Sequence, residues 1–207
     1  MPENLHKLFV ISSPSGGGKT SLINKVFEDS RSANFEKSIS DTSRQKRHGD
    51  LEGKDYYFLS EKDFKEKIKK EEYVEYATVF GNFYGTSKNE IKTKYNNSNL
   101  VLELDWQGAY AVKKLFDDAK LIFLVPPSLD DLKQRLIKRN LDSSESIENR
   151  LSEAKKEISK SEMYDFLVLN DDFDRAFEDL SQILFKGISS KDFNSRVSKD
   201  LIERLVE

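Results

Sequence analysis

The sequence predicts an α/β fold in which helices cover a central parallel sheet. Short apolar runs of the buried-strand type are separated by amphipathic stretches of helix length, and this alternation is typical of parallel sheets. With 207 residues, 37% of them hydrophobic, and no cysteine, the chain can form one domain with a sizeable core and no disulfides. The runs are Leu8–Ile11, Leu100–Leu104, Leu121–Val125 and Phe166–Leu169.

Helices are expected between these strands, and two regions interrupt the alternation. The predicted helices are Lys19–Asp29, Gln107–Phe116, Leu129–Lys138 and Phe173–Phe185, with Ser128 and Asp172 as N-caps. Residues 35–95, rich in Lys, Tyr and Asp, predict an inserted subdomain, and the charged stretch 138–160 predicts a mobile lid. The core is then formed by residues 1–34, 96–137 and 161–207. In the tail, Val197, Leu201 and Leu205 fall on one helical face.

A glycine-rich segment follows the first strand directly and reads Ser13-Pro14-Ser15-Gly16-Gly17-Gly18-Lys19-Thr20. Glycines let backbone N–H groups turn toward an anion, Lys19 can reach β- and γ-phosphates, and the Thr20 hydroxyl can bind Mg²⁺. The helix that follows adds the positive end of its dipole. The usual pattern begins with glycine, where this chain has Ser13. A glycine-rich turn with a solvated lysine is the alternative, and the flanking strand and helix favour the phosphate loop.

A second basic segment suggests a separate phosphate site. Arg44 and Arg47 precede Tyr56, and guanidinium groups bind phosphate through two parallel hydrogen bonds, while a tyrosine hydroxyl can donate a third. An exposed basic loop explains the same residues when they are taken alone. A phosphate loop elsewhere in the chain makes a second phosphate site the better interpretation.

A carboxylate and nearby hydroxyls have the chemistry to read a guanine base. Glu75 could accept the N1–H and N2–H protons of guanine while the hydroxyl of Thr86 donates to O6, an arrangement that adenine cannot satisfy. Packing in the core or in a hairpin is the simpler explanation for the aromatic residues around them, Tyr76, Phe80, Phe83 and Tyr84.

Two further groups carry charge to places where α/β enzymes use it. Asp105 follows an apolar strand, where it could orient Mg²⁺ through water or simply cap the next helix. Arg135, Arg139 and Arg150 lie in or beside the predicted lid and could stabilise the negative charge of a phosphoryl group in transfer. Exposed helix arginines paired with acids are the alternative.

Composition excludes several classes of function. The net charge of −3 argues against a protein built to cover nucleic acid, and two histidines without cysteine leave no zinc site. The N-terminus carries no apolar run of signal-peptide length, and no segment approaches the roughly 20 apolar residues that span a bilayer. A cytoplasmic location without membrane partners is expected.

Taken together, these segments resemble the guanylate kinase family from about Leu8 to about Phe185. The family's S-x-P-S-G-x-G-K-[ST] loop corresponds to Ser12 through Thr20, its T-x-R-x-x-R…G-x-D-Y signature to Thr42 through Tyr56, and its E-x-A…G-N-x-Y-G-[ST] segment to Glu75 through Thr86. Its D-x-D-x-Q-G element is matched with Glu103 in place of the first acid. Its P-P-S, lid-arginine and N-D-D elements follow at Pro126-Pro127-Ser128, Arg135, Arg139, Arg150 and Asn170-Asp171-Asp172.

The resemblance implies a three-layer P-loop kinase fold and assigns the site residues. It implies ATP binding by Ser13, Pro14, Ser15, Gly16, Gly17, Gly18, Lys19, Thr20, Ser21 and Asn170, and GMP binding by Ser40, Arg44, Arg47, Tyr56, Glu75, Tyr84, Thr86 and Asp105. Catalysis would use Lys19, Arg44, Arg135, Arg139 and Arg150, with Mg²⁺ on Thr20 and, through water, on Asp105.

The implied activity is Mg-ATP-dependent phosphoryl transfer to GMP, and to dGMP as well, giving ADP and the diphosphate. One alternative is a non-catalytic binding module of the same family, which the complete phosphate loop and lid arginines disfavour. The other is a kinase for a different small phosphorylated acceptor, against which Glu75 and Thr86 argue. The pattern leaves the oligomeric state, monomer or homo-oligomer, undecided, as it does the part played by residues 190–207.

Overall fold

The computed structural model describes residues 7–79, 81–138 and 144–207, which pack into two compact units. The first unit contains the described residues up to Phe9 together with Asn34–Ala119. The second contains Val10–Ala33 and Lys120–Glu207. Strand β1 (Leu8–Ser12) belongs to both, because the boundary falls within it.

The predicted parallel sheet is present, with the strand order β2-β7-β1-β8-β9. Each apolar run forms a strand: β1, β7 (Asn99–Glu103), β8 (Lys120–Val125) and β9 (Phe166–Leu169). All residues of β1 are buried, as expected for a strand covered on both faces. The fifth strand, β2 (Phe35–Lys37), pairs in parallel with β7. It was not predicted, because its three residues, two half-buried and one exposed, leave no apolar run to detect.

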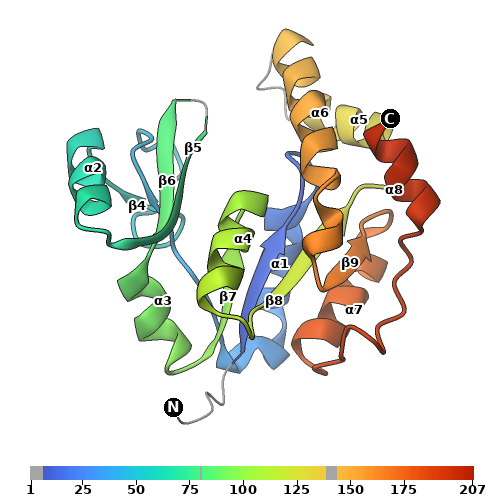
Figure 1. The fold of residues 1–207 in the computed structure, drawn as a ribbon, viewed down its shortest axis with the longest axis horizontal. Helices are drawn as coiled ribbons and strands as arrows, with labels where there is room; N and C mark the ends of the chain where they lie inside the picture. The colour runs from blue at the N-terminus through green and yellow to red at the C-terminus, as the bar shows by residue number, and fades with distance from the viewer. Residues whose placement is uncertain (1–6, 80, 139–143) are drawn as a thin grey trace. The chain divides into compact units, whose positions relative to one another are not determined.

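The rest of the first unit consists of a second sheet and three helices (Figure 1). The sheet has the order β4-β3-β6-β5, from β3 (Asp41–Thr42), β4 (Tyr57–Phe58), β5 (Tyr73–Val79) and β6 (Asn82–Ser87). The helices are α2 (Glu61–Lys69), α3 (Lys88–Tyr95) and α4 (Trp106–Leu115). Phe64 of α2 is fully buried and stacks on Tyr73 and Phe83, with ring centroids 4.5 and 5.3 Å away. These aromatic contacts attach α2 to the second sheet.

The second unit holds the remaining helices. These are α1 (Lys19–Glu28), most of the 3₁₀ helix η1 (Ser30–Asn34), α5 (Leu129–Lys138), α6 (Ser144–Ile158), the 3₁₀ helix η2 (Ser161–Met163), α7 (Phe173–Leu184) and α8 (Lys199–Val206). Both predicted N-caps are confirmed: the Ser128 hydroxyl accepts the Asp131 N–H at 3.0 Å, and the Asp172 carboxylate accepts the Arg175 N–H at 3.0 Å.

The tail differs in part from the predicted helical face. Helix α8 begins after its N-cap Ser198, so Val197 lies in the extended segment that precedes it. Leu205 is buried, and α8 packs against α6. In the described part of the chain, no helix combines the length and the apolar character needed to cross a membrane.

Candidate active site

The glycine-rich segment of the second unit forms a tight loop that leads into α1. The Gly17 N–H donates to the Pro14 carbonyl at 2.8 Å, and Gly18 has φ +87° at the N-cap position of α1. No side chain caps this helix end, and its first turn carries no acidic residue. Lys19 and Thr20 are the first two residues of the helix, followed by exposed Ser21. The positive end of the helix dipole is therefore left to an external anion.

Side chains from three distant segments converge on this loop within the second unit. The Asn170 amide, from the end of β9, donates to the Gly17 carbonyl at 2.7 Å. The Asn170 carbonyl accepts from the guanidinium of Arg135 in α5 at 2.9 Å. Arg150 of α6 donates to the Ser15 hydroxyl at 2.8 Å. Arg150 thus contacts the loop directly, Arg135 contacts Asn170 beside it, and Arg139 lies outside the described residues.

Gly18 is a position where even one added methyl group is expected to disrupt the loop. A Cβ built there would lie 2.5 Å from the Asn170 amide nitrogen, and its φ of +87° strains any L-residue. We expect Gly18→Ala to lower the free energy of unfolding by more than the ~1–2 kcal/mol of backbone strain alone. Gly49→Ala is the matched control, because Gly49 has φ +94° and no atom within 4 Å of its Cβ position. Urea unfolding of both variants measures the difference, and equal losses would contradict the predicted collision.

In the first unit, the residues predicted to read a base lie together. Glu75 of β5 is the register partner of Thr86 on β6, and the Thr86 hydroxyl and backbone N–H both hydrogen-bond its carboxylate. The fully buried Thr86 hydroxyl also lies 3.4 Å from that of Ser40. At Gly108, in the first turn of α4, a Cβ would lie 3.3 Å from the Glu75 carboxylate, so glycine allows the helix to approach this group.

The Glu75 carboxylate is held in an unusual electrostatic state. Burial raises its pKa from 4.5 to about 7, the hydrogen bonds from Thr86 oppose the rise, and the nearby negative charge of Asp105 adds to it. A carboxyl group whose pKa lies near 7 is stabilised in its ionised form by a ligand that donates hydrogen bonds to it. The N1–H and N2–H edge of guanine is such a ligand.

This raised pKa predicts how stability changes with pH. The folded state keeps a proton on Glu75 that the unfolded chain releases above its ordinary pKa of 4.5. The contribution of this group to stability is therefore fully present below pH 4.5 and is lost as pH rises through about 7. We expect the free energy of unfolding of Glu75→Gln, relative to wild type, to increase by roughly 2 kcal/mol between pH 5 and 8.

Urea titrations at several pH values measure this difference. Glu61→Gln, at an exposed position of α2, removes the same charge and serves as the control. A Glu75→Gln difference that is the same at pH 5 and pH 8 would rule out a carboxyl group with a raised pKa.

The predicted phosphate-binding residues form a second cluster in the first unit. The Arg44 guanidinium lies 5.5 Å from the ring centroids of both Tyr56 and Phe58, and Tyr56 packs edge-on against Tyr84 at 5.7 Å. Burial is the main reason that the pKa of Tyr56 rises to about 12, so its hydroxyl stays protonated and can donate a hydrogen bond. Arg47 is exposed in the same loop.

Asp50 is a residue of this cluster that the sequence analysis missed. Its carboxylate pairs with the Arg44 guanidinium at 2.9 Å and accepts the backbone N–H of Arg47 at 2.7 Å. It therefore orients the Arg44 side chain and fixes the backbone at Arg47, and no motif around it signalled these contacts. A bound phosphate would compete with Asp50 for Arg44.

Asp105 occupies the N-cap position of α4, and its roles toward GMP and Mg²⁺ stay predictions. One of its carboxylate oxygens accepts the Gly108 N–H at 2.8 Å, so it caps α4. Asp105 belongs to the first unit, and Thr20, the other residue predicted to bind Mg²⁺, belongs to the second. Glu103, which replaces the family's aspartate, pairs with Lys37 at 2.8 Å. Among the described residues, no group of three His, Asp or Glu side chains could hold a metal ion.

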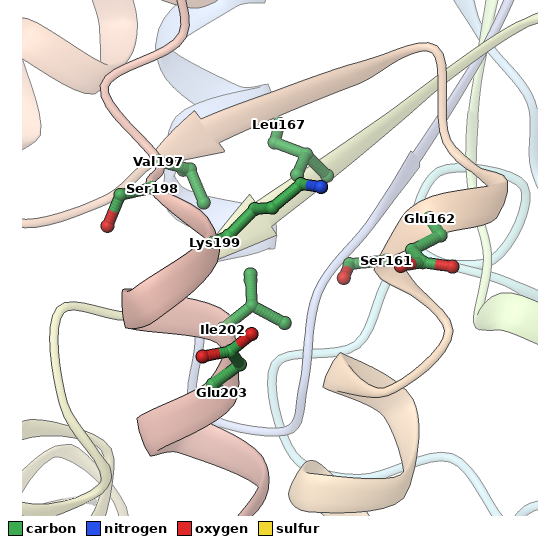
Figure 2. A pocket seen from close by; sticks show the side chains of 8 residues that line it. All are labelled: Ser161, Glu162, Leu167, Val197, Ser198, Lys199, Ile202 and Glu203. Atoms are coloured by element: carbon green, nitrogen blue, oxygen red, sulfur yellow. The ribbon is translucent and has the colours of Figure 1, made fainter.

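A pocket of about 300 Å³ lies elsewhere in the second unit (Figure 2). Leu167, Val197 and Ile202 supply its apolar wall, and Ser161 and Glu162 face α8 across it. None of the predicted site residues lines this pocket. Its volume therefore says nothing about the nucleotide chemistry, which depends on the loop and on the two clusters described above.

Comparisons with known proteins agree with this geometry. Residues 5–187 match the family model described as guanylate kinase. The chain is 44% identical over 186 residues to a guanylate kinase of Wolbachia sp. subsp. Brugia malayi, covering 89% of this chain and 94% of the relative. It is 47% identical over 178 residues to that of Hahella chejuensis, covering 86% and 85%. The crystal structure of guanylate kinase from Anaplasma phagocytophilum superimposes with a TM-score of 0.71 at 33% identity, covering 90% of this chain and 88% of that one.

Proposed function

Because this chain belongs to the guanylate kinase family and is an ATP:GMP phosphotransferase, we propose how its own residues divide the work of the reaction. The second unit binds ATP, and the first binds GMP. The observation that carries this division is the convergence of Asn170, Arg135 and Arg150 on the phosphate loop. In the first unit, Glu75, Thr86 and Ser40 form the site for the guanine base, and the cluster around Arg44 and Tyr56 forms the site for the GMP phosphate.

On the ATP side, the loop from Ser13 to Thr20 surrounds the phosphates with backbone N–H groups. Lys19 neutralises charge on the β- and γ-phosphates, and Asn170 contacts the nucleotide from the end of β9. Arg150, which contacts the loop at Ser15, and Arg135, which contacts Asn170, stabilise the negative charge of the group in transfer.

The Thr20 hydroxyl fits Mg²⁺, because it is an oxygen donor beside a helix end that carries no competing acid in its first turn. A bound Mg²⁺ would supply positive charge that offsets the negative charge of the phosphates. Thr20 would hold it together with the nucleotide phosphates, and Asp105 would act at most through water.

On the GMP side, the ionised Glu75 accepts the two guanine N–H groups, and the Thr86 hydroxyl donates to O6 with Ser40 beside it. Arg44, Arg47, Tyr56 and Tyr84 bind the 5′-phosphate. A phosphate oxygen of GMP then attacks the γ-phosphorus of ATP in line, the bond to the bridging oxygen breaks, and ADP leaves. No side-chain nucleophile takes part, so positioning and charge compensation supply the catalysis.

We also propose that the protein acts in the cytoplasm. Its partners there are ATP and GMP or dGMP, and it binds neither nucleic acid nor membrane. The division into core residues 1–34, 96–137 and 161–207, GMP-binding subdomain 35–95 and lid 138–160 is part of the same proposal. The two compact units are a division by packing and leave this functional division a prediction.

The test of this proposal is a coupled assay of ADP formation from Mg-ATP. GMP, dGMP, AMP, UMP and CMP are offered separately to the purified chain. Selective turnover with the two guanine nucleotides is the expected result. Turnover with another acceptor would overturn the assignment of Glu75 and Thr86, and binding of GMP without turnover would indicate a binding module instead.

A further inference from the structure

Arg196 lies outside the part of the chain that matches the family model, which ends at residue 187, and it makes three hydrogen bonds in the second unit. Its guanidinium donates to the Asp171 carboxylate at 2.7 Å, to the Leu169 carbonyl at 2.9 Å and to the Asp179 carboxylate at 3.1 Å. We propose that Arg196 is a positioning residue for ATP, which acts by fixing the segment Leu169–Asp171 and through it Asn170.

The three acceptors of Arg196 enclose the residue on which the ATP side depends. Leu169 and Asp171 are the neighbours of Asn170 in the chain, so both flanks of Asn170 are bound to the same side chain. Asn170 itself is buried, with only 4% of its surface exposed. Its side chain donates to the Gly17 carbonyl of the phosphate loop, and its carbonyl accepts from Arg135. A shift of this segment therefore changes both contacts together.

Arg196 is itself held firmly in place by its neighbours. The Ser195 hydroxyl donates to the Leu167 carbonyl at 2.6 Å and accepts the Val197 N–H at 3.2 Å. Ser198 then caps α8, whose Leu205 is buried. The segment that carries Arg196 thus lies along β9, beside the pocket in Figure 2 that Leu167 and Val197 line. Because the backbone around Arg196 is anchored, its guanidinium can hold the segment Leu169–Asp171 in one place.

The chemistry of the contact requires arginine. A planar guanidinium directs its donors along fixed directions and can serve two carboxylates and a carbonyl at once, whereas an ammonium is a point charge on a flexible stem. Burial raises the pKa of Asp171, but the hydrogen bond and positive charge of Arg196, together with backbone N–H groups, more than offset it and keep the pKa below its usual value. The Arg196–Asp171 pair is therefore charged on both sides across the neutral range.

The inference rests on the proposed placement of Asn170 against ATP, and steady-state kinetics of four variants can separate the two. The variants are Arg196→Ala, Arg196→Lys, Asn170→Ala and the control Arg204→Ala, which removes an exposed charge from α8. For each, kcat and the KM values for ATP and for GMP are measured, together with the thermal midpoint.

We expect Arg196→Ala to raise the KM for ATP about fivefold or more, as is usual for removal of one member of a hydrogen-bonded network, and to leave the KM for GMP within about twofold. Arg196→Lys, which keeps the charge and protects the fold, should raise the KM for ATP by an intermediate amount. Arg204→Ala should match wild type in both constants.

Three outcomes would overturn the inference. They are an unchanged KM for ATP in both Arg196 variants, an equal rise in both KM values, and a loss of stability in Arg196→Ala with normal kinetics in Arg196→Lys. If Asn170→Ala raises the KM for ATP while the Arg196 variants do not, only this inference fails. If Asn170→Ala leaves the KM for ATP unchanged, the proposed contact of Asn170 with ATP fails first.

Discussion

Replacement of Lys19 by alanine is expected to lower kcat by about 10²–10³-fold and to leave the affinity for GMP within about twofold, because one preorganised cation is lost from the transferring phosphoryl group. Lys19 begins α1 directly after Gly18, so its charge adds to the positive end of the helix at the phosphates. Single-turnover kinetics measure the chemical step, and calorimetric titration with GMP measures acceptor binding.

Two variants sharpen this test. Lys25→Ala removes the same charge from the last turn of α1, where Lys25 makes only an exposed 3.8 Å pair with Glu28, and should retain full activity. Arg47→Ala, in the first unit, should instead weaken GMP binding. Equal loss of GMP affinity in Lys19→Ala and Arg47→Ala would contradict the division between an ATP side and a GMP side.

Replacement of Glu75 by glutamine is expected to lower kcat/KM for GMP by about 10²–10³-fold. The carboxylate accepts hydrogen bonds from two guanine N–H groups, whereas a glutamine amide has only one oxygen that can accept them. The glutamine amide sets an N–H₂ group against the guanine N–H donors. The same amide can pair with the edge of adenine, which presents both a donor and an acceptor. The activity with GMP should therefore fall by more than the activity with AMP, and this lowers the preference for GMP over AMP.

Competition between GMP and AMP in one reaction mixture gives this ratio directly. Glu61→Gln again supplies the charge control in the same unit. An unchanged GMP to AMP preference in Glu75→Gln would show that another group reads the base. The nearby hydroxyls of Ser40 and Thr86 would then be the next residues to test.

Local patterns in the sequence were sufficient for most of the sheet and its helices. Helix α5 has the predicted bounds Leu129–Lys138. Helices α1 and α7 differ from prediction by one residue at the C-terminal end, and α4 differs by one residue at each end. Such elements depend on apolar periodicity and on capping residues, which neighbours in the sequence determine. Strand β2 was missed because its pairing with β7, more than sixty residues later, determines it.

The candidate site divides in the same way. The loop from Ser13 to Thr20 could be recognised from its spacing, because its geometry comes from consecutive glycines and the helix that follows. The aspartate Asp50 and the arginine Arg196 could not be recognised, because exposed loops and tails carry many charged residues and the pattern does not say which acid pairs with which base.

By itself, the sequence determined the α/β class, the phosphate loop and the family, since these depend on residue types at fixed short spacing. The tertiary structure alone decided that Asn170 contacts Gly17, that Arg150 contacts Ser15 and that Asp105 caps a helix. The first two contacts join residues 153 and 135 positions apart in the chain. Only tertiary packing brings residues so far apart in the chain into contact. In the first unit, burial, which is also a tertiary effect, raises the pKa of Glu75.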